Sequence, residues 1–101
     1  MKRFPFKTMY GDARGYGYIV EKTYSSPNNL CLEVHDSEGP LLIATTNIAG
    51  YHCDSGNVLI KNWSENQGVY EALLAAGVIG PVIRKVPTGF VEAYECKYLW
   101  G

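Results

Sequence analysis

Apolar and polar residues alternate along the first half of the chain with the two-residue period of β-strands. The alternation runs first from Tyr16 to Tyr24 and resumes at Leu30, where polar residues separate Leu32 and Val34. Segment 25–29, between the two stretches, is rich in serine and asparagine and contains a proline, which is typical of a turn. The pattern therefore predicts two half-buried strands.

A hairpin and a short strand extend this pattern toward the middle of the chain. Residues 36–39 are typical of a tight turn in which Gly39 adopts a positive φ, and they lead into a third strand over residues 41–47. No period is visible from Ala49 to Asn57, which predicts a long loop. A fourth strand is expected at residues 58–61.

The period then changes to that of a helix, which is expected from about Ser64 to Ala76. Ser64 and Gln67 match the capping box, in which a hydroxyl and an amide satisfy free N–H groups of the first turn. Gly77 stands where a left-handed residue ends a helix. The expected inward stripe consists of Val69, Ala72, Leu73, Leu74 and Ala76.

Two strands at residues 82–86 and 90–96 follow, joined by a turn at residues 87–89. Four strands, one helix and two closing strands predict an α+β fold, with a mostly antiparallel sheet of about five to six strands and the helix packed on one face. The length of 101 residues and the 47% hydrophobic content are those of one domain spanning residues 1–101.

The charge is nearly balanced, with 9 Lys and Arg residues against 10 Asp and Glu residues. Because the cations do not dominate and the carboxylates are scattered, the sequence predicts neither direct nucleic-acid binding nor mimicry of DNA. The apolar stretch 72–83 contains two glycines and a proline and is shorter than the roughly 20 residues of a membrane span. Segment 1–7 lacks the apolar region of an export signal, so a soluble cytoplasmic protein is expected.

The three cysteines are odd in number and widely spaced, which favours reduced thiols over a disulfide framework. Cys31 and His35 share a strand face, but four residues along a strand span about 13 Å, too far for a catalytic pair. His52 and Cys53 are neighbours and lack the spacing of zinc ligands. The sequence therefore predicts neither a cysteine nucleophile nor a metal site.

Two further motifs lack the context that catalysis requires. Glycine-rich segment 11–17 has no Gly-Lys-Ser/Thr ending of a phosphate loop and precedes a strand, so a bulge or hairpin is expected there. Glu92 and Glu95 fall on opposite faces of their strand and cannot act as paired carboxylates. No enzyme activity and no cofactor are predicted.

Aromatic residues, at 13% of the chain with eight tyrosines, are the compositional excess that bears on function. Tyrosine provides rigid, amphipathic contact area at protein interfaces, although it also packs well in sheets, and the sequence leaves both roles open. The residues that we predict to bind a partner are Tyr16, Tyr18, Tyr24, Tyr51 and His52.

Polar residues at the expected helix start support a different hypothesis. Asn62, Glu65 and Asn66 lie where free N–H groups and the helix dipole can attract an anionic ligand. Helix capping accounts for the same residues, and the negative charge of Glu65 opposes a phosphate. The alternative is therefore a small-ligand protein that sequesters a nucleotide signal with these residues and loop Ala49 to Asn57.

The block from Val58 to Ile79 resembles a family of small uncharacterised proteins from phages and conjugative elements. The shared pattern is an apolar strand ending in lysine, then an aromatic-Ser-Glu-Asn-x-Gly helix start and an Ala/Leu helix. The positions that match it are Asn47, Lys61, Ser64, Glu65, Asn66 and Gly68. The family's domain has no known function, so the resemblance implies a setting and no active site.

That setting implies a non-enzymatic phage or mobile-element protein in the cytoplasm of a bacterial host. Small proteins of such elements often bind host proteins, so the resemblance favours an inhibitor that binds a host protein, such as an anti-defence or anti-CRISPR type inhibitor. The oligomeric state is left open, with a homodimer among the alternatives.

Overall fold

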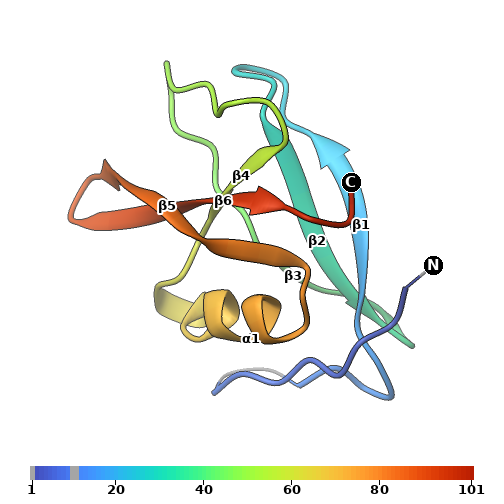
Figure 1. The fold of residues 1–101 in the computed structure, drawn as a ribbon. Helices are drawn as coiled ribbons and strands as arrows, with labels where there is room; N and C mark the ends of the chain where they lie inside the picture. Colours follow the sequence, from blue (N-terminus) through green and yellow to red (C-terminus); the bar gives the residue numbers. More distant parts are fainter. Residues whose placement is uncertain (1, 10–11) are drawn as a thin grey trace.

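The computed structural model describes residues 2–9 and 12–101 and has the α+β class and the element order that the sequence predicts. Its elements are β1 (Tyr18–Thr23), β2 (Leu30–Asp36), β3 (Gly39–Ile43), β4 (Asn57–Ile60), the 3₁₀ turn η1 (Ser64–Asn66), α1 (Val69–Ala75), β5 (Ile79–Thr88) and β6 (Val91–Tyr98). Figure 1 shows α1 below the region where the strands cross, with the N-terminal segment beneath it.

The strands form two antiparallel three-stranded sheets, β1-β2-β3 and β4-β6-β5, where the sequence predicted one sheet. The predicted third strand ends early, at Ile43, because the chain there passes from the first sheet to the second. The Ala44 N–H donates to the carbonyl of Leu32 in β2, while Thr45 forms a β-bridge with Ile60 in β4. This short segment therefore joins the edges of the two sheets.

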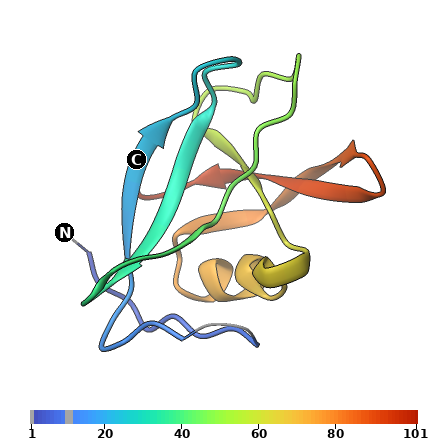
Figure 2. The same cartoon turned by 180° about the vertical axis from the view of Figure 1, so that it is seen from behind.

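The hydrophobic core lies between the inner faces of the two sheets. Leu32 and Val34 of β2 and Val58 and Ile60 of β4 are all completely buried, as their alternation predicted for β2. Leu73 of α1 joins the same cluster and is also completely buried. Figure 2 shows the β5–β6 hairpin extending away from this body, so its tip contributes little to the core.

The glycine-rich segment before β1 folds back on the N-terminal residues, as the predicted hairpin requires. Phe4 and Gly17 form a β-bridge, and Lys7 forms another with Asp12. A Cβ atom at Gly17 would lie 3.1 Å from the Cβ of Phe6, so this close crossing favours glycine. The part of the prediction that concerns Gly11 falls outside the described residues.

The predicted helix from Ser64 to Ala76 is wrong at its start. Only residues 64–66 form a 3₁₀ turn, and α1 begins at Val69 after Gly68, whose φ is +92°. The capping box is not formed, because Ser64 itself has a φ of +57° and no side chain caps η1. The side chain of Asn62 takes over this function, since its Oδ1 accepts a hydrogen bond from the N–H of Tyr70 at 3.1 Å.

The predicted end of the helix is confirmed. Gly77 has a φ of +74°, and its N–H donates to the carbonyl of Leu74. The N–H of Val78 donates to the carbonyl of Leu73 at 3.0 Å, which completes a Schellman motif.

Replacing Asn62 with alanine is expected to lower the free energy of unfolding by about 1 kcal/mol, because the first turn of α1 then loses its side-chain acceptor. Ser64→Ala is expected to change it by less than about 0.5 kcal/mol, because the exposed Ser64 caps no helix. Urea unfolding of both variants measures the difference. A larger loss for Ser64→Ala would support the capping box instead.

Candidate functional site

The side of β1-β2-β3 that points away from the core carries a group of half-exposed residues. In the antiparallel register, Tyr18 pairs with His35, and Val20 pairs with Glu33. Ile43 pairs with Glu33 from the other side and is 50% exposed. Together with Tyr16, these residues are called the outer face below: Tyr16, Tyr18, Val20, Glu33, His35 and Ile43.

Three rings and one guanidinium form a continuous row along the outer face. The ring centroids of Tyr16 and Tyr18 are 6.0 Å apart, and those of Tyr18 and His35 are 5.5 Å apart. The guanidinium carbon of Arg3 lies 4.2 Å from the ring centroid of Tyr16. Such contacts restrict the rotamers of the row, which presents a preorganised aromatic surface.

A carboxylate fixes one end of this row. Glu33 accepts a hydrogen bond from Nε2 of His35 at 2.9 Å and pairs with Nζ of Lys22 at 3.1 Å. The hydrogen bond from His35, followed by that from Lys22, holds the pKa of Glu33 below its ordinary value. The ring of His35 is therefore held in place by two contacts, one with the ring of Tyr18 and one between its Nε2 and Glu33.

The other predicted partner-binding residues lie elsewhere or serve the fold. The hydroxyl of Tyr24 contacts the carbonyl and the hydroxyl of Thr45, and burial raises the pKa of Tyr24 to about 12. Tyr51 and His52 belong to the loop between β3 and β4, where Tyr51 donates a hydrogen bond to Glu95 and His52 is exposed. The structure thus brings Tyr16 and Tyr18 together and places Tyr51 and His52 on another part of the molecule.

Glu95 is completely buried and ties the long loop to β6. Its Oε1 accepts from the Tyr51 hydroxyl and from Arg84 at 2.7 Å, and its Oε2 accepts from the Asn57 amide at 2.7 Å and the Asp54 N–H at 3.3 Å. Burial alone would raise the pKa of Glu95, but hydrogen bonds from Tyr51, Asn57 and Arg84 outweigh it, so the net shift is downward. Both oxygens are engaged, which is the arrangement of a structural anchor.

Cys53 lies beside this anchor and is half-buried. Burial raises the pKa of the Cys53 thiol to about 11, and the nearby carboxylates of Glu95 and Asp54 add to the effect. The thiol is therefore protonated at neutral pH, a state in which cysteine is a poor nucleophile.

The stability of the protein is expected to fall in acid because of the buried carboxylate. The pKa of Glu95 is lowered in the folded state, so its contribution is complete above the ordinary value of 4.5 and is lost as the pH falls through the folded-state pKa. Urea unfolding between pH 3 and 7 is expected to show a plateau above about pH 5 and a decline below it. A decline that Glu95→Gln leaves unchanged would assign the acid sensitivity to other groups.

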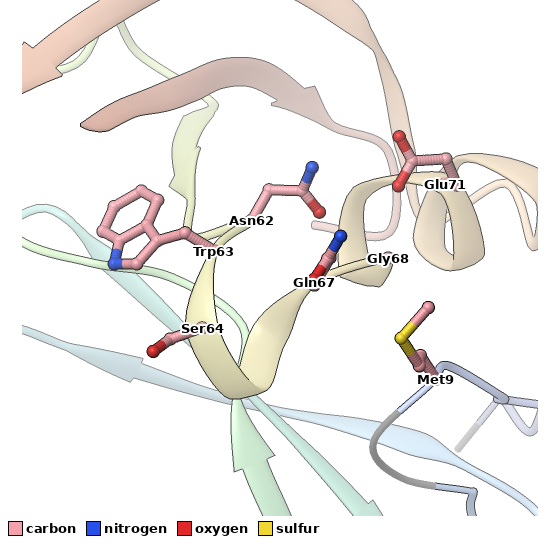
Figure 3. Close-up of a pocket in the computed structure, with 7 residues that line it drawn as sticks. All are labelled: Met9, Asn62, Trp63, Ser64, Gln67, Gly68 and Glu71. Carbon is pink, nitrogen blue, oxygen red and sulfur yellow. The ribbon is translucent and has the colours of Figure 1, made fainter. Parts of the chain in front are cut away.

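An open cavity of about 630 Å³ lies at the start of the helical region. Figure 3 shows the residues that line it: Met9, Asn62, Trp63, Ser64, Gln67, Gly68 and Glu71. Of the predicted ligand-binding residues, Asn62 borders this cavity, whereas Glu65 and Asn66 line a different one. Glu65 pairs with Lys61 at 2.6 Å, and the buried Asn66 amide donates to the Ile43 carbonyl at 2.7 Å. The predicted ligand residues therefore do not converge on one site.

Within residues 2–9 and 12–101, no group of three or more His, Cys, Asp and Glu side chains is placed to hold a metal ion. The longest helix there, α1, has 7 residues, whereas a helix that crosses a membrane needs about 20.

Three exposed or half-exposed features were not anticipated from the sequence. His35 joins the aromatic row through cross-strand register, and Arg3 joins it because the N-terminal segment folds back beside β1. Phe90 is 109% exposed at the turn of the β5–β6 hairpin, next to Gly89 with a φ of +62°. Of these three, only the exposure of Phe90 was indicated by the local sequence, because Phe90 follows the predicted turn at residues 87–89.

Comparison of the chain with protein-family models, with curated proteins and with solved structures found no match in any of the three searches.

Proposed function

We propose that this protein is a non-enzymatic binding protein whose outer face docks on another protein. The observation that carries the proposal is the continuous row formed by Arg3, Tyr16, Tyr18 and His35. Aromatic residues and arginine are the side chains that most often dominate binding energy at protein interfaces. A row that is already ordered loses little conformational freedom on binding.

The asymmetry of the first sheet supports this assignment. The inner residues Leu32 and Val34 are 0% exposed, whereas Ile43 on the outer face is 50% exposed. An amphipathic sheet with one face on the core normally presents polar residues on the other. Around the paired carboxylate of Glu33, the outer face instead presents rings and aliphatic side chains, which is typical of an interaction surface.

The partner we propose is a bacterial host protein, and the outcome of binding is its inhibition. This step rests on the resemblance of residues 58–79 to proteins of phages and conjugative elements, in which small non-catalytic proteins often act on host defence systems. The proposal places the protein in the host cytoplasm, as an anti-defence inhibitor that acts by stoichiometric binding.

Affinity capture from a bacterial host lysate tests the proposal. The unaltered protein is expected to retain a host protein in stoichiometric amount. The double variant Tyr16→Ala, Tyr18→Ala is expected to capture at least about tenfold less of that host protein, because two central contacts are removed. Phe90→Ser is the control, since it removes a fully exposed ring from the far hairpin.

The far-ultraviolet circular dichroism of the variants must match that of the unaltered protein. Equal capture by the double variant, or capture of nothing by any of the three proteins, would refute the outer face as the binding surface.

The second candidate function is binding of a small ligand in the cavity beside Asn62 and Gln67, which the open volume of about 630 Å³ favours. A ligand at 100 times its dissociation constant stabilises the folded state by about 2.7 kcal/mol. A thermal-shift screen with nucleotides therefore decides this alternative. Stabilisation that is lost in Gln67→Ala would support it, and the absence of any shift would remove it.

A further inference from the structure

A cavity of about 500 Å³ separates the N-terminal segment from α1. It is distinct from the cavity at the helix start and shares no lining residue with it. The residues that line it are Arg3, Phe4, Pro5, Lys7, Ala72, Ala75, Ala76 and Trp100.

The floor of this cavity is apolar and has a fixed shape. Phe4 is 5% exposed and makes an edge-to-face contact with Trp100, with 5.4 Å between the ring centroids. α1 presents only alanines to the opposite wall, and the small side chains of Ala72, Ala75 and Ala76 leave the space open. The volume suits one large apolar side chain together with its backbone.

The rim of the cavity is positively charged. Arg3 and Lys7 line it, and Nζ of Lys2 lies 5.2 Å from the ring centroid of Trp100. Within the described residues, none of these three cations pairs with a carboxylate, whereas Arg14, Lys22, Lys61 and Arg84 all do. Lys85 and Lys97 also lack a carboxylate partner among the described residues, but they lie singly on β5 and β6. In a chain with a net charge of −1, three unpaired cations thus lie around one apolar cavity.

We propose that this cavity binds an acidic peptide segment of the protein partner, with one large apolar side chain between the floor and the alanine wall and flanking carboxylates against Lys2, Arg3 and Lys7. The inference rests on the proposed function, because the same partner occupies both surfaces. Arg3 connects them, since it lines the cavity and stacks on Tyr16 of the outer face.

The charge distribution favours an acidic peptide over a nucleic acid. A nucleic acid would need cations that continue along the outer face, but the lysine there, Lys22, is already paired with Glu33 at 3.1 Å. A peptide needs only a short basic rim, and a carboxylate close to Arg3 and Lys7 gains charge-assisted hydrogen bonds.

Selection from a random peptide display library on the immobilised full chain tests the proposal without assuming a sequence. Enriched peptides are expected to carry one aromatic or large aliphatic residue flanked by Asp or Glu. Fluorescence anisotropy with the best synthetic peptide is expected to show binding that weakens with salt. The affinity is expected to fall at least about tenfold in Lys7→Glu, which reverses a rim charge, and in Ala75→Phe, which fills the space beside the alanine wall. Lys85→Glu is the control, because it changes the net charge equally at an exposed position on β5.

The proposal is overturned if neutral or basic peptides are enriched, if no peptide is enriched, or if Lys85→Glu weakens binding as much as Lys7→Glu. It is also overturned if oligothymidylate or phosphatidylserine vesicles bind with the same dependence on Lys7 and Ala75. Capture of the host partner by Ala75→Phe at the unaltered level would refute the cavity and leave the outer face standing. Peptide binding without any captured host protein would refute the proposed function itself.

Discussion

Replacing Glu95 with alanine is expected to lower the free energy of unfolding by about 3–5 kcal/mol, the largest effect of any substitution considered. Arg84, Tyr51 and Asn57 all donate to this carboxylate, which is completely buried. Alanine would leave the Tyr51 hydroxyl and the Asn57 amide without this acceptor, and a buried donor without a partner costs its full desolvation energy. Arg84, which is partly exposed, would keep its contact with Asp54 at 3.4 Å. The loop between β3 and β4 would also lose its attachment to β6.

The matched control is Glu92→Ala, on the same strand and on its exposed side. This substitution is expected to change the free energy of unfolding by less than about 0.5 kcal/mol. Urea unfolding, with hydrogen exchange of the loop amides, measures both variants. If Glu95→Ala costs no more than Glu92→Ala, the carboxylate does not anchor the loop.

Leu73→Ala is expected to lower the free energy of unfolding by about 2–5 kcal/mol, the range for removing a large aliphatic side chain from a core. α1 has only 7 residues and begins after Gly68, which has a left-handed backbone conformation and, as a glycine, provides no side-chain cap. Isolated helices of this length are not stable in water, so packing must hold α1 in place. Leu73 is the larger of the two residues of α1 that are completely buried, the other being Val69.

Leu74→Ala is the comparison, because Leu74 is only half-buried against the same cluster. Its expected loss is about 1 kcal/mol, since less apolar surface returns to water on unfolding. Thermal unfolding monitored by circular dichroism at 222 nm would rank the two variants. Equal losses would mean that helix propensity, and not burial, determines the stability of α1.

The local pattern predicted the elements and missed the features that depend on distant contacts. Alternation found β2, whose Leu32 and Val34 are buried as expected, and Gly77 ends the helix as expected. The division into two sheets was missed, because it depends on how the segment after Ile43 pairs with β2 and β4. The helix start was missed because Ser64 and Gln67 match a capping box even though Gly68 breaks the helix behind them.

The same distinction holds for the functional surface. The even spacing of Tyr16 and Tyr18 predicts that they share a strand face, and in the structure their rings are in tilted contact, with 6.0 Å between the centroids. His35 and Arg3 enter the row from other segments, through strand register and the folded-back N-terminal residues. The role of Glu95 was missed for a related reason, since its partner Tyr51 is 44 residues away in the sequence.

Photocrosslinking in a bacterial host tests the central claim that the outer face binds a protein. The photoreactive residue p-benzoylphenylalanine would replace Tyr18 in one variant and Phe90, on the remote hairpin, in another. We expect an adduct of one defined mass after irradiation of the variant altered at Tyr18, and none for the variant altered at Phe90. No adduct from the position of Tyr18, or the same adduct in equal yield from both positions, would contradict this claim.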